Sequence, residues 1–253
     1  MLKDINIFRN HGKQYVPDLS KAVLPEIFRG RPLIDNGITP EEAARVAKLC
    51  PVGAIGESPC SIDLGQCVFC KECEFALPGR IRFTADYKMA SNSPEGLIIR
   101  QGRDRPLSLD PDKVRPEIHR FFKHALKLRQ VSAGGDNSAE MELNAAGNVN
   151  FDMGRYGIEF VASPRHADGI VITGPITGNM AEALKICYAA IPDPKIIILV
   201  GTDAISGGIF NNSQVLNRDF LSQYKIDLYI PGNPPHPLTF INGVLDLIKG
   251  INR

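Results

Sequence analysis

The chain has 253 residues, a net charge of +1, 43% hydrophobic residues and 23% charged residues. These values are those of a globular protein with one large or two small domains, and they exclude a broad basic surface for nucleic acid or an anionic membrane. With no apolar run of membrane-spanning length and no apolar segment typical of a secretory signal near residue 1, we expect a protein of the reducing cytoplasm.

The first segment, residues 1–30, is polar and too short to bury a core of its own. We expect an extended N-terminal arm that lies on the rest of the protein or on a partner. The second segment, residues 31–103, contains five of the six cysteines. We expect it to be a separate small domain.

Three of those cysteines, Cys67, Cys70 and Cys73, have the spacing C-x-x-C-x-x-C. A bacterial ferredoxin run would continue with a fourth cysteine before a proline, where this chain has Leu77. In two-cluster ferredoxins that fourth cysteine ligates the other cluster, so the missing ligand should come from an earlier cysteine followed by proline. Cys50 is such a residue. The pattern predicts one [4Fe–4S] cluster held by these four cysteines.

The ligand positions of a second ferredoxin cluster would be Leu77, Val46, Ala43 and Pro40, none of which is a ligand. We therefore interpret residues 31–103 as an α+β ferredoxin-like domain with one cluster and an apolar filling of the other site. The alternatives are a zinc site or free cysteines in the core, although zinc sites favour paired C-x-x-C knuckles over a triple run. The two remaining cysteines are Cys60, with no assigned role, and Cys187, which we expect to be a buried structural thiol.

Residues 104–126 are rich in Pro, Asp and Arg and are expected to be a linker. Residues 127–253 then alternate short apolar strands with helical patterns. Strands are predicted at 128–133, 157–163, 168–174, 195–201 and 226–232, and helices at 179–191 and 237–251. This alternation predicts a flavodoxin-like α/β domain with a parallel sheet and helices on both faces.

Sites in such sheets form at the loops that leave the carboxyl ends of the strands. Four loops at these positions are rich in Gly or Pro, at 133–142, 173–180, 201–210 and 231–238. Glycine lets a backbone approach a bound group closely. We expect a site, past or present, along this edge.

The same loops carry a family resemblance. "LRQVSAGGDNSAEMELNA", "SPRHADGIVITGPITGNM", "GTDAISGGIF" and "IPGNPPHPL" resemble the small subunit of membrane-bound, energy-converting (group 4) [NiFe] hydrogenases. The module is also similar to the 20-kilodalton cluster-bearing subunit of respiratory complex I. The likeness covers residues 127–250, and the ferredoxin-like segment ahead of it resembles a fusion found in some of these hydrogenases.

The resemblance implies four cysteines for a proximal [4Fe–4S] cluster. At the corresponding positions this chain has Asp136, Ala139, Asp203 and Asn233, while the neighbouring Glu140 is kept. We therefore expect the proximal cluster to be missing. The oxygen ligands of these side chains would suit Mg²⁺ or Ca²⁺, but polar filling of the old site is the favoured interpretation because hard cations usually need more oxygens.

The resemblance also implies a partner interface. Glu140, Arg165 and His166 belong to the surface that packs on the large subunit in the family, and His236 is expected to be a loop or interface residue. An isolated phosphate site is disfavoured, because "AGGDNS" lacks both the P-loop lysine and a G-x-G-x-x-G pattern.

These observations predict an accessory electron-transfer subunit of a hydrogenase-like or complex-I-like assembly, with one cluster and no catalytic residues of its own. We expect as partners a hydrogenase-like large subunit and further complex subunits, no nucleic acid, and membrane association only through partners at the inner face of the cell membrane. A mainly structural subunit is the first alternative. A stand-alone flavin-binding or nucleotide-binding protein is the second.

Overall fold

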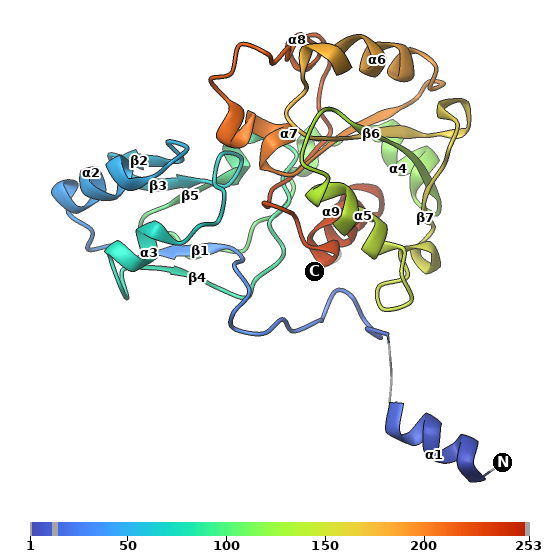
Figure 1. Cartoon of the computed structure of the whole chain (residues 1–253), viewed down its shortest axis with the longest axis horizontal. Helices are drawn as coiled ribbons and strands as arrows, with labels where there is room; N and C mark the ends of the chain where they lie inside the picture. The colour runs from blue at the N-terminus through green and yellow to red at the C-terminus, as the bar shows by residue number, and fades with distance from the viewer. Residues whose placement is uncertain (1, 12–14, 251–253) are drawn as a thin grey trace.

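The structure, a computed structural model, describes residues 2–11 and 15–250. Residue 1 and residues 12–14 of the expected arm, and residues 251–253, where the predicted C-terminal helix ends, lie outside the described residues. Figure 1 shows a unit of small sheets beside a unit with one larger sheet, and a helix, α1 (Leu2–His11), apart from both. The arm was expected to be extended, so this helix is a difference from the sequence-based expectation.

The first unit contains two antiparallel sheets. β1 (Pro32–Ile34) pairs with β4 (Ile81–Phe83), and β2 (Ile55–Glu57), β3 (Cys60–Asp63) and β5 (Ile98–Arg100) form the other. Two helices, α2 (Pro40–Leu49) and α3 (Glu72–Ala76), and the 3-10 turn η1 (Pro94–Leu97) complete it. The antiparallel strands and short helices agree with the expected α+β character.

Helix α2 has a well-defined start and end. Thr39 accepts a hydrogen bond from the backbone of Glu42, the Glu42 side chain accepts one from Thr39, and Pro40 stands in the first turn. The helix ends at Leu49 with Cys50 as its C-cap, so the helix fixes the position of this cysteine. On its inner face Ala43 and Val46 share a core with Leu77, each at most 3% exposed, whereas Pro40 is exposed.

The stretch expected to be a linker contains a 3-10 turn, η2 (Pro111–Lys113), and a helix, α4 (Pro116–Phe122). Ile118 and Phe122 are spaced four residues apart, so both point to one side of α4, where they are buried in the core of the larger unit. This helix was not predicted from the sequence, because proline and charged residues outnumber these two apolar residues in the stretch. These residues pack onto the sheet domain.

The larger sheet has five parallel strands in the order β10-β9-β8-β6-β7. The strands are β6 (Leu126–Ser132), β7 (Ile158–Phe160), β8 (Gly169–Thr173), β9 (Ile196–Val200) and β10 (Leu228–Ile230). This is the flavodoxin-like order, with the switch point between the first and third strands of the domain. The expected flavodoxin-like parallel sheet is confirmed.

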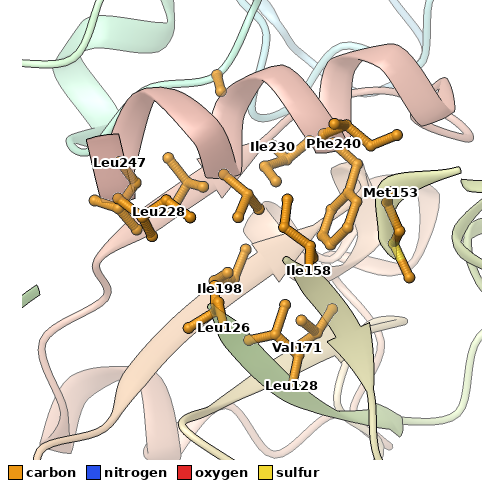
Figure 2. Close-up of a cluster of buried hydrophobic side chains, with 14 of the residues drawn as sticks. Leu126, Leu128, Met153, Ile158, Val171, Ile198, Leu228, Ile230, Phe240 and Leu247 are labelled. Carbon is orange, nitrogen blue, oxygen red and sulfur yellow. The ribbon is translucent and has the colours of Figure 1, made fainter. Parts of the chain in front are cut away.

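Helices cover both faces of this sheet. On one face α9 (Pro237–Lys249) packs against α4 and α5 (Ser138–Ala146), and Figure 2 shows Phe240 and Leu247 of α9 above side chains of the strands. The core of the other face includes buried residues from α6 (Gly178–Ala189), α7 (Thr202–Ser206) and α8 (Asp219–Gln223). The 3-10 turns η3 (Met153–Tyr156), η4 (Pro164–His166) and η5 (Gly208–Phe210) lie in the connections.

The two units are joined by backbone pairing and by the arm. Ser91 of the first unit forms an antiparallel bridge with Tyr229 of β10, which covers the edge of the parallel sheet. Leu19 of the arm is fully buried, and its carbonyl accepts hydrogen bonds from Tyr87 Oη (2.9 Å) and Asn242 Nδ2 (3.0 Å). The arm therefore connects the two units, through Tyr87 of the first and Asn242 of the second. No helix among residues 2–11 and 15–250 is long and apolar enough to cross a membrane.

Candidate functional site

A first cavity is lined by the four predicted cluster ligands, Cys50, Cys67, Cys70 and Cys73. All four are free thiols. Most of the other lining residues are apolar: Val52, Ala54, Ile55, Ile62, Val68 and Phe83. Lys71 and Glu72 are the two charged residues of the lining. The structure thus brings together Cys50 at the end of α2, Cys67 and Cys70 from the loop before α3, and Cys73 from α3 itself.

The loop between the cysteines is bent by residues in the left-handed region. Phe69 has φ 54° and Lys71 has φ 71°, a conformation that non-glycine residues rarely adopt. The Phe69 backbone N–H donates to Cys67 Sγ at 3.3 Å, and the Ala54 N–H donates to Cys50 Sγ at 3.2 Å. Backbone donors that point at ligand sulfurs are among the features that set the properties of iron–sulfur sites.

Burial raises the pKa of Cys67 and that of Cys73 to about 12. Negative charge on the neighbouring cysteines makes a smaller contribution to both shifts, and the Phe69 N–H opposes the shift at Cys67. The cavity therefore disfavours thiolates unless a positive group compensates them, which bound iron would do.

Within the described part of the chain, no group of three or more His, Cys, Asp or Glu side chains, the four cysteines included, is arranged to hold one metal ion. A single ion needs its ligands converging on one centre, about 2.3 Å from each sulfur for zinc. In a [4Fe–4S] cluster each cysteine binds a different iron, so the four sulfurs surround a larger group and stay further apart.

A second cavity is lined by all four positions at which the family resemblance implies proximal-cluster cysteines, Asp136, Ala139, Asp203 and Asn233. Glu140 lines it as well. These residues follow β6, β9 and β10, so the parallel sheet brings them to its carboxyl edge near the topological switch point. Residues almost a hundred positions apart in the sequence therefore share one site.

The carboxylates of this cavity differ in environment. Asp136 Oδ1 accepts hydrogen bonds from the Ser138 hydroxyl (2.6 Å) and backbone (2.9 Å), which lower the pKa of Asp136. The pKa of Asp203 is raised by burial first and then by the negative charges of Asp136 and Glu140. Burial and the like charges of its neighbours therefore make Asp203 harder to ionise than Asp136.

Three further residues of this region were missed by the sequence analysis. Thr173 donates to Glu140 Oε1 at 2.6 Å, and Arg218 donates to the carbonyls of Pro175, Asp203, Ala204 and Ile205. Thr202 donates to the carbonyl of Cys67 at 2.8 Å. The sequence signal for the two threonines is a polar residue at the end of an apolar strand, whereas nothing in the local sequence marks Arg218.

The remaining predicted residues lie elsewhere. Arg165 and His166 are both exposed in η4, and neither lines the second cavity. His236 is the N-cap of α9, where its ring Nδ1 accepts from the Leu238 N–H at 3.1 Å. Cys60 is buried in the core of the first unit, and Cys187 is only partly buried, so the latter differs from the buried thiol expected.

Comparisons with known proteins match the larger unit. Residues 137–247 match the family described as "NADH ubiquinone oxidoreductase, 20 Kd subunit". A probable membrane-bound hydrogenase subunit of Pyrococcus furiosus is 36% identical over 51% of this chain and 77% of its own length. A subunit of the NADH-quinone oxidoreductase of Bacteroides thetaiotaomicron is 43% identical over 44% of this chain and 57% of its own.

Among solved structures, a chain of the membrane-bound sulfane sulfur reductase, an archaeal respiratory membrane complex, aligns with a TM-score of 0.45 and 27% identity. The alignment covers 55% of this chain and 78% of that one. The sequence relatives confirm the resemblance expected from the loop motifs. This chain therefore belongs to the family of the 20-kilodalton subunit of NADH:ubiquinone oxidoreductase and its membrane-bound hydrogenase counterparts.

Proposed function

We propose that the protein is an accessory electron-transfer subunit of a hydrogenase-like or complex-I-like oxidoreductase, with one [4Fe–4S] cluster held by Cys50, Cys67, Cys70 and Cys73. The observation that carries the proposal is the apolar cavity with four free cysteines around it. When bound, the cluster would supply one-electron transfer. The protein supplies the four thiolates, two backbone donors to sulfur and a mostly apolar wall.

The proximal cluster of the family is absent in this proposal. Its four positions offer two carboxylates, an amide and a methyl group, and these are not the soft thiolate ligands that hold iron–sulfur clusters. Asp136 is already bonded to Ser138, which supports polar filling of the site over cation binding. Electrons would then pass through the ferredoxin-like unit alone.

The partners we propose are a hydrogenase-like large subunit and further subunits of such an assembly, because the relatives named above are subunits of this kind. Attachment to the inner face of the cell membrane would be through those partners. The proposed domains are an arm at 1–30, the cluster domain at 31–103, a connector at 104–126 and the hydrogenase small-subunit domain at 127–253.

The test is metal analysis of the anaerobically purified full chain. We expect about four irons and four sulfides per chain. Cys70→Ala should lose the cluster, while Cys187→Ala, a change outside the cavity, should keep about four irons. An equally stable Cys70→Ala protein with unchanged iron would refute the ligand assignment, and about eight irons would refute the absence of the proximal cluster.

A mainly structural role for the cluster is the second candidate. Cys67 and Cys73 are part of the hydrophobic core of the small unit, so bound metal would stabilise that unit whether or not it transfers electrons. A measurement on the purified assembly can distinguish the two roles. An electron-transfer subunit requires the cluster to be reduced and reoxidised during turnover, whereas a structural cluster stays in one oxidation state.

A further inference from the structure

Thr202 joins three segments of the chain. Its hydroxyl lies 2.8 Å from the carbonyl oxygen of Cys67 and 3.2 Å from that of Gly232, and its backbone N–H donates to Gly232 O at 2.9 Å. A hydroxyl has one proton to donate, so the shorter contact, to Cys67, is the main bond. The residue is fully buried, so water offers no replacement for this bond.

This bond connects the two cavities. Cys67 lines the cysteine cavity, and Thr202 lines the cavity of the lost proximal ligands. The surrounding contact is tight, because a Cβ added to Gly65 would come within 2.9 Å of Ile205 Cγ2. Arg218 donates to three carbonyls of α7, the helix that begins at Thr202, and these bonds hold that helix in place.

The cysteine cavity has a buried side and an open side. Cys67 and Cys73 are each 8% exposed, while Cys50 and Cys70 are partly exposed. Thr202 contacts the buried side. A cluster in this cavity would therefore have one side toward the carboxyl edge of the parallel sheet and the other toward solvent or a partner.

We propose that Thr202 is a positioning residue for the cluster ligand Cys67, which holds the buried side of the cluster against the edge of the sheet where the proximal cluster is missing. The inference rests on the proposed function, because it requires the cluster at the four cysteines. It gives the cluster an orientation: the Cys67 side lies toward the edge of the parallel sheet, and the Cys50 and Cys70 side is the more exposed one.

The hydroxyl should also influence the reduction potential. Reduction adds negative charge to the cluster, and hydrogen bonds around the ligands help to set the potential. Without the Thr202 proton, the negative end of the Cys67 carbonyl dipole is no longer compensated beside the cluster. Reduction becomes harder, so the midpoint potential should fall. Loss of an outer contact to a ligand should also make iron release to a chelator faster, by about tenfold.

The experiment compares Thr202→Val with Thr202→Ser in the anaerobically prepared full chain. The measurements are iron content, the midpoint potential from a titration followed by electron paramagnetic resonance, and the rate of iron loss to a chelator. We expect Thr202→Val to keep about four irons with a lower potential and faster iron loss, and Thr202→Ser to restore the parental values. Thr239→Val is the matched control, because Thr239 is 1% exposed and its hydroxyl has no partner among the described residues.

Three outcomes would overturn the inference. A parental chain without iron refutes the proposed function and this inference with it. A parental chain with about four irons, combined with an unchanged potential and spectrum in Thr202→Val, refutes the role of Thr202 alone. An equal shift in Thr239→Val would show a general packing effect. If Thr202→Val does not fold, Thr202→Ala removes the same hydroxyl with less bulk, and the same shift is expected from it.

Discussion

Arg115 and Asp227 form a two-pronged ion pair between the connector and the parallel sheet. Arg115 Nε lies 2.8 Å from Asp227 Oδ1, and Arg115 Nη2 lies 3.0 Å from Oδ2. Asp227 also accepts from the backbone of Ile197, and Arg115 donates to the carbonyl of Lys195. The Asp227 side chain is only 3% exposed, so Arg115 takes the place of water as its partner.

We therefore expect Arg115→Ala to destabilise the fold strongly. Removal of one partner from a buried pair leaves an uncompensated charge, which costs about 3–5 kcal/mol. Urea unfolding followed by circular dichroism measures this. Lys21→Ala is the control, because Lys21 is 84% exposed in its pair with Asp18 and its loss should change stability by less than about 1 kcal/mol. Equal stability of the two variants would contradict a structural role for the buried pair.

His236 should make stability depend on pH. Burial lowers the pKa of His236 below its ordinary value of 6.5, and its Nδ1 must stay unprotonated to accept from Leu238. The rings of Phe28 and Phe151 pack on it edge-on, and Arg29 lines the same cavity. Among the described residues that line this cavity, none is a carboxylate that could stabilise the cation.

The sign follows from proton binding. Below pH 6.5 this histidine binds a proton more readily in the unfolded chain than in the folded chain. The contribution of His236 to the free energy of unfolding should therefore be complete above pH 6.5 and should fall as the pH drops. His236→Asn keeps an N-cap acceptor without titration in this range. Its unfolding free energy should fall less between about pH 7.5 and 5.5 than that of the parental chain. The same pH dependence in both proteins would assign the effect to other groups.

Restored cysteines should restore the proximal site if its loops keep the family geometry. The quadruple variant Asp136→Cys, Ala139→Cys, Asp203→Cys and Asn233→Cys places thiols around the second cavity, which these four positions already line. After anaerobic reconstitution we expect about four more irons than in the parental chain. A folded variant without additional iron would show that the loops no longer have the shape that a cluster requires.

Arg165 should contribute to the partner interface. It is exposed in η4, within the motif that in the family belongs to the surface packing on the large subunit. Arg165→Glu should reduce co-purification of the partner from the native host more than Lys113→Glu, which reverses another exposed charge in the connector. The full interface should bury more than about 1,000 Å². A chain that purifies alone and monodisperse from its host would contradict the partnership altogether.

The local patterns of the sequence determined the parts of the fold that depend on neighbouring residues. Apolar runs such as "KIIILVG" predicted the five strands, because a strand buried on both faces needs continuous apolar side chains. The spacing of Cys67, Cys70 and Cys73, with the distant Cys50, predicted a shared site for the same reason that it does in ferredoxins. Both inferences use residue type and short-range spacing only.

Other features depended on contacts between distant segments, which local spacing does not encode. Leu19 looks like part of a polar arm, yet the two units bury it completely. Helix α4 was not predicted, because Ile118 and Phe122 become part of a core only when they pack with distant residues such as those of α9. The bond between Thr202 and Cys67 spans 135 positions, and only the packing of the small unit onto the edge of the parallel sheet brings these two loops within hydrogen-bond distance.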